Sequence, residues 1–128
     1  MKKILPPRLQ KGDKVGIAAP AGPITEKQLA TAISRVEKAG YIAVPAEGIT
    51  NRLGYLAGSD EGRARQINAL FADKSIKAIL AARGGFGCTR ILDKIDYELI
   101  KQNPKIIGGY SDLTALICAI NKKTGLVT

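Results

Sequence analysis

The chain has 128 residues, 45% of them hydrophobic and 24% charged, which is the composition of a folded domain with one core and excludes a disordered chain. Its formal net charge of +9 at pH 7 is high enough to suggest a nucleic-acid partner. The aromatic fraction of 5%, however, leaves no stacking platform among the basic residues, so we expect a solvated basic surface and no nucleic-acid or membrane partner.

The N-terminal segment carries a large share of the positive charge. Residues 1–14 contain five Lys or Arg residues and one Asp, and we expect them to form an arm on the surface. The segment begins like a signal peptide, but Pro6, Pro7 and Arg8 interrupt it before an apolar stretch forms. We therefore expect the protein to stay in the cytoplasm.

The first strand is expected at residues 15–19, a short apolar run typical of a strand that is buried on both faces. Thr25 is placed to cap a helix, and Gln28 is placed to complete a capping box. Gly40 ends this helix, and a second strand follows at residues 41–44. The sequence thus opens with a strand, a helix and a strand.

A long polar loop follows the second strand and ends at Ser59. Such loops often carry function, because they are too long to be simple connectors. Ser59 or Asp60 then caps a helix, and a third strand is expected at residues 76–81. The helix has a mostly apolar stripe formed by Ala64, Ile67, Asn68, Leu70 and Phe71.

The remaining elements continue the alternation of helices and strands. A short helix passes through Ile91 and Leu92, and Asp96 caps another helix. That helix ends at about Gln102, and a strand is expected at residues 105–108. A helix at residues 113–123, closed by Gly125, and the start of a fifth strand at residues 126–128 complete the chain.

Strands that alternate with helices form a parallel sheet covered by helices on both faces. We therefore predict an α/β fold, a three-layer flavodoxin-like sandwich with a mainly parallel sheet, of the class I glutamine amidotransferase type. Ligands of such sheets bind beyond the carboxyl ends of the strands. That rule selects three loops, at residues 20–24, 83–87 and 109–112.

Ser111 lies between an apolar strand and a helix, where a nucleophile elbow exposes a hydroxyl at the edge of the sheet. Gly109 supplies the small residue expected two positions before the nucleophile, but Leu113 stands where the second one would be. The helix dipole would favour negative charge at Ser111, and the N–H of Asp112 would point at a developing oxyanion. The alternative is that Ser111 or Asp112 only caps the helix, which from spacing alone is the more common case.

The loop Arg83-Gly84-Gly85-Phe86-Gly87 is the second candidate. Its three glycines would let main-chain N–H groups approach an anion or a tetrahedral oxygen. It is not a dinucleotide fingerprint, because Arg90 stands at the position of the third glycine, and no Walker A lysine follows. The alternative is a turn that merely needs positive φ.

The two cysteines, Cys88 and Cys118, fall in segments expected to be helical. The chain has no histidine that could complete a Cys/His metal set. We therefore expect no metal site. Two reduced thiols in the core are expected, and a disulfide is the less favoured alternative for a cytoplasmic chain.

Three segments resemble the LD-carboxypeptidase family, serine peptidases that include muramoyltetrapeptide carboxypeptidases and microcin self-immunity proteins. These segments are LQKGDKVGIAAPAGP at 9–23, RGGFG at 83–87 and NPKIIGGYSDLTAL at 103–116. They stand in the family's order and spacing, and the resemblance covers nearly the whole chain. Phe86 and Cys88 depart from the pattern, because tyrosine and a small residue are usual there.

In that family the serine at the position of Ser111 is the nucleophile, and the N–H groups at the positions of Asp112 and Gly85 form the oxyanion hole. A glutamate and a histidine from a C-terminal domain complete the triad, and this chain contains no histidine. The residues beside the oxyanion hole and the nucleophile are expected to bind substrate: Arg83, Gly84, Phe86 and Tyr110.

The resemblance implies that the whole protein releases terminal D-alanine from murein tetrapeptides by cleaving an L,D bond, in peptidoglycan recycling, without a metal or organic cofactor. Residues 1–128 would then be the N-terminal, nucleophile-bearing domain of a longer protein, inactive alone, and a homodimer is allowed. Two alternatives stay open: a microcin-immunity-like hydrolase of peptidyl-aminoacyl nucleotides, and a non-catalytic flavodoxin-like binding module.

Overall fold

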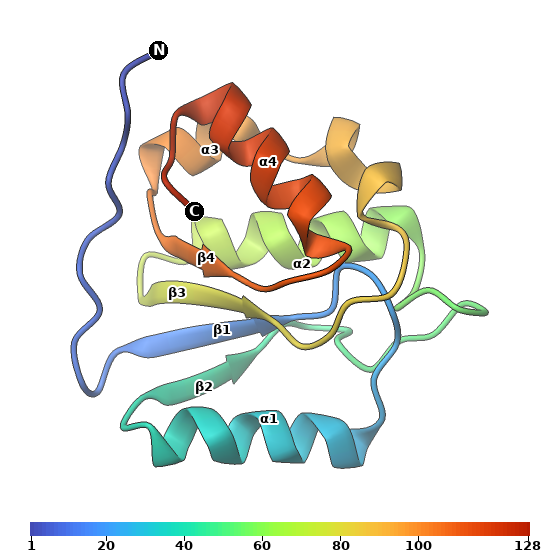
Figure 1. The fold of residues 1–128 in the computed structure, drawn as a ribbon. Helices are drawn as coiled ribbons and strands as arrows, with labels where there is room; N and C mark the ends of the chain where they lie inside the picture. The colour runs from blue at the N-terminus through green and yellow to red at the C-terminus, as the bar shows by residue number, and fades with distance from the viewer.

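The computed structural model describes all 128 residues and contains one parallel sheet of four strands in the order β2-β1-β3-β4 (Figure 1). The strands are β1 (Lys14–Ala18), β2 (Ile42–Pro45), β3 (Ile76–Ala81) and β4 (Ile106–Gly108). The helices are α1 (Glu26–Lys38), α2 (Asp60–Ala72), the 3₁₀ helix η1 (Cys88–Lys94), α3 (Tyr97–Gln102) and α4 (Leu113–Thr124). This is the predicted α/β fold, and none of its helices has both the length and the apolar character that a membrane crossing needs.

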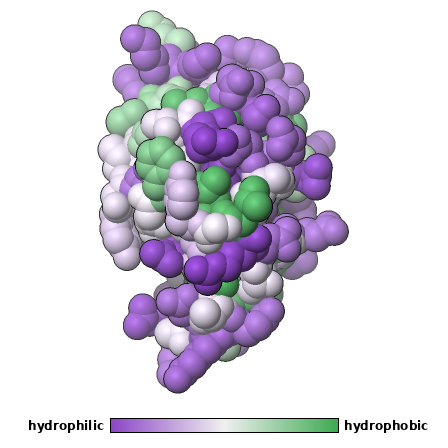
Figure 2. Space-filling model, turned by 90° about the vertical axis from the view of Figure 1, so that its right-hand side faces the viewer, coloured by the Kyte–Doolittle hydropathy of each residue, from purple (hydrophilic) through white to green (hydrophobic).

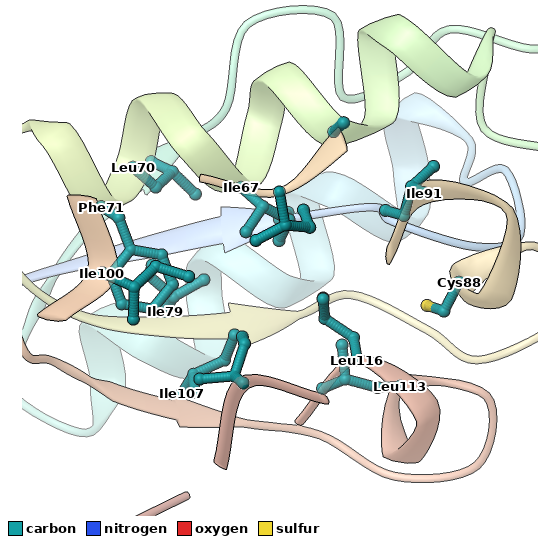
Figure 3. Packing of buried hydrophobic residues seen from close by; sticks show 14 of the residues in the cluster. Ile67, Leu70, Phe71, Ile79, Cys88, Ile91, Ile100, Ile107, Leu113 and Leu116 are labelled. Carbon is teal, nitrogen blue, oxygen red and sulfur yellow. The ribbon is translucent and has the colours of Figure 1, made fainter. Parts of the chain in front are cut away.

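The alternation of side chains along the strands divides the core into two clusters. Ile17 of β1 belongs to a small cluster against α1, whereas its neighbour Ala18 faces a larger cluster of 18 buried residues. The larger cluster includes Phe71 of α2, Ile79 of β3 and Leu116 of α4 (Figure 3). The three predicted layers are present, with most of the apolar burial on the α2 and α4 side of the sheet.

The α1 layer covers only part of its face of the sheet. Helix α1 packs chiefly on the edge strand β2. Leu80 of β3, on the same face, is 40% exposed. The prediction of helices over both faces is therefore correct for β1 and incomplete for the far half of the sheet.

The first two strands begin and end one residue away from their predicted bounds, and hydrogen bonding explains both shifts. The N–H of Ala19 leaves the sheet and donates to Oε1 of Gln66 at 2.8 Å, so β1 ends at Ala18. The N–H of Tyr41 still donates to the carbonyl of Val36 at the end of α1, so β2 begins at Ile42. Pro45 can end β2 because β2 is an edge strand.

The predicted helix caps are present. Thr25 and Gln28 form the capping box of α1, with N–H to side-chain distances of 2.9 and 3.1 Å. Ser59, rather than Asp60, caps α2, and Asp96 caps α3. Gly125 follows α4 with a φ of +81°, the left-handed conformation that glycine adopts most readily.

The last residues do not extend the sheet as predicted. Leu126 is fully buried and forms a single parallel bridge with Ile4, in the N-terminal segment, instead of pairing with β4. Ile4 is half-buried and packs against the larger cluster, so the segment expected to be a surface arm is partly anchored. The two ends of the chain thus pair with each other at this point.

Candidate active site

The three loops selected from the sequence meet at the carboxyl ends of β1, β3 and β4, on the right-hand side of Figure 1. The N–H of Gly22 donates to the carbonyl of Gly84 at 3.0 Å, and the guanidinium of Arg83 donates to the carbonyl of Pro23 at 2.9 Å. A Cβ atom on Gly84 would lie 2.9 Å from Cβ of Ser111. The loops therefore form one contiguous surface.

Ser111 lies at a sharp turn between β4 and α4. Its φ of +58° makes it the one residue other than glycine with a positive φ, a conformation that costs energy and recurs at functional sites. The residue is exposed, and Asp112 directly precedes the first turn of α4. This is the backbone geometry that a nucleophile elbow requires.

The alternative role of a helix cap receives no support. Neither Ser111 nor Asp112 caps α4 through its side chain, and the Asp112 carboxylate instead accepts a hydrogen bond from the N–H of Cys88 at 2.8 Å. Strain at Ser111 therefore lacks the compensation that a side-chain cap would supply.

The absence of a side chain at Gly109 makes room for the side chain of Leu113. A Cβ atom on Gly109 would lie 2.1 Å from Cδ2 of Leu113, whose side chain is buried in the larger cluster. The elbow tolerates leucine at a position where a small residue is usual, because Gly109 leaves room for it.

The glycine loop needs its glycines for conformation and for contact. Gly85 and Gly87 have φ values of +119° and +122°. A Cβ atom on Gly85 would lie 3.0 Å from the backbone of Gly22. The N–H groups of Gly85 and Asp112 donate to no atom of the chain, so both are free to donate to a ligand.

The loops that carry the candidate substrate-binding residues lie at the end of the molecule that Figure 2 faces, where hydrophobic and hydrophilic groups are intermingled. Tyr110 is 75% exposed, and Phe86 is exposed beside Tyr55, with ring centroids 5.9 Å apart. Tyr55 comes from the long polar loop and was not identified from the sequence.

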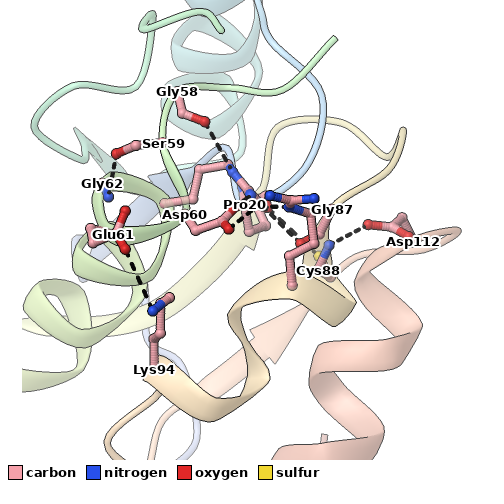
Figure 4. A network of polar contacts seen from close by, with 12 residues as sticks. Pro20, Gly58, Ser59, Asp60, Glu61, Gly62, Gly87, Cys88, Lys94 and Asp112 are labelled. Atoms are coloured by element: carbon pink, nitrogen blue, oxygen red, sulfur yellow. Dashed lines mark hydrogen bonds and ion pairs between the residues drawn. The ribbon is translucent and has the colours of Figure 1, made fainter. Parts of the chain in front are cut away.

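A buried arginine beneath the loops was also missed. Arg63 of α2 is fully buried, and its guanidinium donates to the carbonyls of Pro20 at 2.8 Å, Gly87 at 2.9 Å and Gly58 at 3.3 Å (Figure 4). It also pairs with Asp60. The signal available in the sequence was an arginine beside Ala64 in the apolar stripe, three residues after an aspartate.

Asp60 joins this buried arginine to a second one on the surface. Its carboxylate accepts two hydrogen bonds from Arg90, at 3.0 and 3.1 Å. The hydrogen bond from Arg90, followed by the charges of Arg90 and Arg63, holds the pKa of Asp60 below its usual range despite some burial. Asp60 therefore stays ionised and compensates the buried guanidinium.

The two cysteines differ, contrary to the prediction of two core thiols. Cys88 is buried, but Cys118 is exposed, because it lies on the opposite face of α4 from the buried Leu116 and Ile120. Burial, reinforced by the hydrogen bond and charge of Asp112, raises the pKa of Cys88 to about 12. No group of three or more His, Cys, Asp or Glu side chains is placed to hold a metal ion.

Comparisons with known proteins agree on one family. A family model described as the LD-carboxypeptidase N-terminal domain matches residues 15–128. The chain is 46% identical over 123 residues to the "Probable murein peptide carboxypeptidase" of Bacillus subtilis strain 168, covering 96% of this chain and 39% of that protein.

Two relatives have solved structures. The microcin C7 self-immunity protein MccF of Escherichia coli is 33% identical to this chain over 123 residues. The structure of MccF in complex with aspartyl sulfamoyl adenosine matches this chain with a TM-score of 0.93 at 32% identity. Muramoyltetrapeptide carboxypeptidase from Oxalobacter formigenes matches with a TM-score of 0.78 at 30% identity. The two matches cover 98% and 86% of this chain but only 38% and 37% of those chains, so the sequence spans well under half the length of these relatives.

Proposed function

Because the chain belongs to the LD-carboxypeptidase family, whose N-terminal domain it carries, we propose that it bears the nucleophile of a serine carboxypeptidase acting on murein tetrapeptides. The observation that carries the proposal is the backbone of Ser111, held at a φ of +58° between β4 and α4 beside a glycine loop. A strained serine at the carboxyl edge of a parallel sheet is the arrangement of a nucleophile elbow.

In this mechanism Oγ of Ser111 attacks the carbonyl carbon of the bond between the L-centre of a diamino acid and the terminal D-alanine. The carbonyl oxygen becomes an oxyanion that accepts hydrogen bonds from the N–H groups of Asp112 and Gly85. The proton of Ser111 passes to a base and then to the leaving amine of D-alanine. Water then hydrolyses the acyl-enzyme ester and regenerates the serine.

We propose that the base comes from outside residues 1–128, since this chain has no histidine, the most common general base. Lys105, the nearest preceding basic residue in the sequence, lies at the opposite end of β4 from Ser111 and donates to carbonyls before β3. We therefore propose that a further domain supplies a histidine and a glutamate, together with most of the substrate-binding surface, and that residues 1–128 alone are inactive.

The arginine and the two aromatic side chains near the site are proposed to contact substrate. Phe86 and Tyr110 are exposed on the loops that carry Gly85 and Ser111, and Arg83 precedes the same glycine loop. The basic charge of the chain favours a substrate with free carboxylates. Gly84 packs against Ser111, which leaves no room there for a side chain and keeps the nucleophile accessible. A cytoplasmic location, a role in peptidoglycan recycling and a homodimer stay predictions.

The test is Ser111→Ala in the whole protein, with D-alanine release from a murein tetrapeptide followed by mass spectrometry. We expect turnover to be abolished while the protein remains folded, since loss of a hydroxyl at an exposed turn costs at most about 2 kcal/mol. Ser75→Ala, an exposed serine before β3, is the matched control and keeps full activity. Turnover above a small fraction of wild type in Ser111→Ala would remove Ser111 from the role of nucleophile.

A second substrate class is favoured by one observation. MccF in complex with aspartyl sulfamoyl adenosine matches with a TM-score of 0.93, against 0.78 for the muramoyltetrapeptide carboxypeptidase of Oxalobacter formigenes. The sequence identity of 46% to the Bacillus subtilis murein peptide carboxypeptidase favours the murein substrate instead. The same assay with an aminoacyl-nucleotide analogue in place of the tetrapeptide separates the two. A protein that turns over neither substrate, and does not react with serine-directed reagents, would instead be a binding module.

A further inference from the structure

The burial of Arg63 in the first turns of α2 is energetically costly. Its side chain is fully buried, and it lies in the first turns of α2, near the positive end of the helix dipole, where a cation is disfavoured. A buried cation is tolerated only when it is paired and its donors are satisfied. Asp60 supplies the charge, and carbonyls of three separate segments accept the remaining hydrogen bonds.

Those carbonyls belong to segments that surround the candidate active site. Pro20 begins the first of the three loops, Gly87 ends the glycine loop, and Gly58 ends the long polar loop. The contact with Gly87 is tight, because a Cβ atom at that position would lie 2.7 Å from Nη1 of Arg63. One rigid guanidinium therefore fixes the relative positions of three loop ends.

The peptide group between Gly87 and Cys88 is held from both sides. Its carbonyl accepts from Nη1 of Arg63 at 2.9 Å, and its N–H donates to Oδ2 of Asp112 at 2.8 Å (Figure 4). The peptide is planar, so its two ends move together. A cation at one end and an anion at the other polarise it in the same direction, and hydrogen bonds in such a chain strengthen each other.

This peptide connects the two halves of the proposed oxyanion hole. Gly85 lies two residues before it on the glycine loop, and Asp112 directly follows Ser111 at the elbow. We propose that Arg63 and the carboxylate of Asp112 are positioning residues that clamp the Gly87–Cys88 peptide and thereby set the distance from the glycine loop to Ser111. The inference rests on the proposed function, because it assigns a purpose to the spacing between the two N–H donors.

The experiment measures kcat and KM for D-alanine release by the whole protein, with thermal unfolding recorded for every variant. Asp112→Ala removes the acceptor but keeps the backbone N–H, and we expect kcat to fall by about tenfold to a hundredfold with KM little changed, as for a small misplacement of a catalytic group. Asp112→Asn retains an oxygen acceptor and should recover part of that loss. Arg63→Lys keeps the charge but cannot reach three carbonyls, and Arg65→Lys, exposed on the same helix, is its matched control.

Coupling between the two residues separates positioning from mere stability. If both act through one peptide, the variant with Arg63→Lys and Asp112→Ala together loses little more kcat than Asp112→Ala alone. Losses that multiply, or lowered melting temperatures with unchanged kcat, would overturn the proposal. Should Arg63→Lys fail to fold, the variants Asp112→Ala and Asp112→Asn still test the proposal. Equal kcat in Asp112→Ala and wild type refutes the clamp. Ser111→Ala distinguishes failure of the clamp from failure of the proposed function. An inactive Ser111→Ala together with a fully active Asp112→Ala contradicts only the clamp.

Discussion

The two ends of the sheet each contain a buried cation, and they use it differently. At the carboxyl end Arg63 pairs with Asp60 and holds carbonyls from three different segments beneath the candidate active site. At the amino end Lys105 is only 4% exposed and has no carboxylate partner; its ammonium donates to the carbonyls of Asp73 and Ile76.

The difference shows in how each charge responds to its surroundings. Burial lowers the pKa of Lys105 to about 8, with the charge of Asp73 opposing and that of Lys77 adding to the shift. The buried cation at the end opposite the proposed chemistry is therefore one whose charge changes within a pH range open to experiment.

The largest predicted contrast between the two ends is in activity, and it compares two glycines. Gly85→Ala, at the carboxyl end, should lower kcat by about 10²- to 10³-fold, more than it changes KM, because it displaces an oxyanion donor. Gly12→Ala, before β1 at the amino end, imposes a comparable strain at a φ of +88° but meets no atom within 4 Å.

Gly12→Ala is thus a matched control for backbone strain. It should lower the melting temperature and leave kcat unchanged. A Gly85→Ala variant that altered only KM would favour ground-state binding over oxyanion stabilisation.

A smaller effect is expected from Lys105→Met, which should destabilise the fold without changing kcat. The substitution leaves the carbonyls of Asp73 and Ile76 without a donor, a cost of about 1–3 kcal/mol each where they stay dry. Chemical denaturation gives the free energy of unfolding, and D-alanine release gives kcat. A large loss of kcat in folded Lys105→Met would mean that the two ends are not independent.

The same residue predicts a dependence of stability on pH. Between about pH 8 and 10.5 the unfolded chain keeps the lysine proton that the native protein has released, so the unfolded state binds more protons. Stability of the wild type should therefore rise with pH in this window relative to Lys105→Met, and the difference should be flat below pH 7. Denaturation of both proteins at several pH values measures it, and a difference that is constant from pH 7 to 10 contradicts the lowered pKa.

The smallest effect is a contrast between the two thiols. Iodoacetamide should modify Cys118, which is exposed, and spare Cys88, whose thiol is buried and has a pKa raised to about 12. Peptide mapping by mass spectrometry after labelling of the native protein distinguishes them. Labelling of Cys88 at the rate of Cys118 would show that the glycine loop opens in solution.

The sequence predicted the fold because its signals are local. Short apolar runs placed all four strands, and Thr25 and Asp96 each cap a helix as expected. Of the two candidates for the cap of α2, Ser59 is the one that caps it. The three loops at the carboxyl ends were predicted because a parallel sheet brings those ends together, whatever the side chains are.

Other features depend on contacts between distant residues, and the sequence did not reveal them. The local signal of Arg63, an arginine beside the apolar stripe, is weak, since arginine on a helix is usually solvated. Its burial is tolerable in part because of the carbonyls of Pro20 and Gly87, which are distant in the sequence. The bridge between Ile4 and Leu126 joins opposite ends of the chain for the same reason. The exposed side of Cys118 follows from which face of α4 meets the core.

The most direct test of the central claim is to find the residue that becomes covalently bonded. The whole protein is treated with a phosphonate ester analogue of the D-alanine-terminated peptide, which phosphonylates an activated serine, and the adduct is located by peptide mass spectrometry. The account predicts one adduct per active site, on Ser111, and none on Ser111→Ala. An adduct on another residue, or turnover of tetrapeptide by a protein that never forms one, would contradict the assignment of Ser111 as the nucleophile.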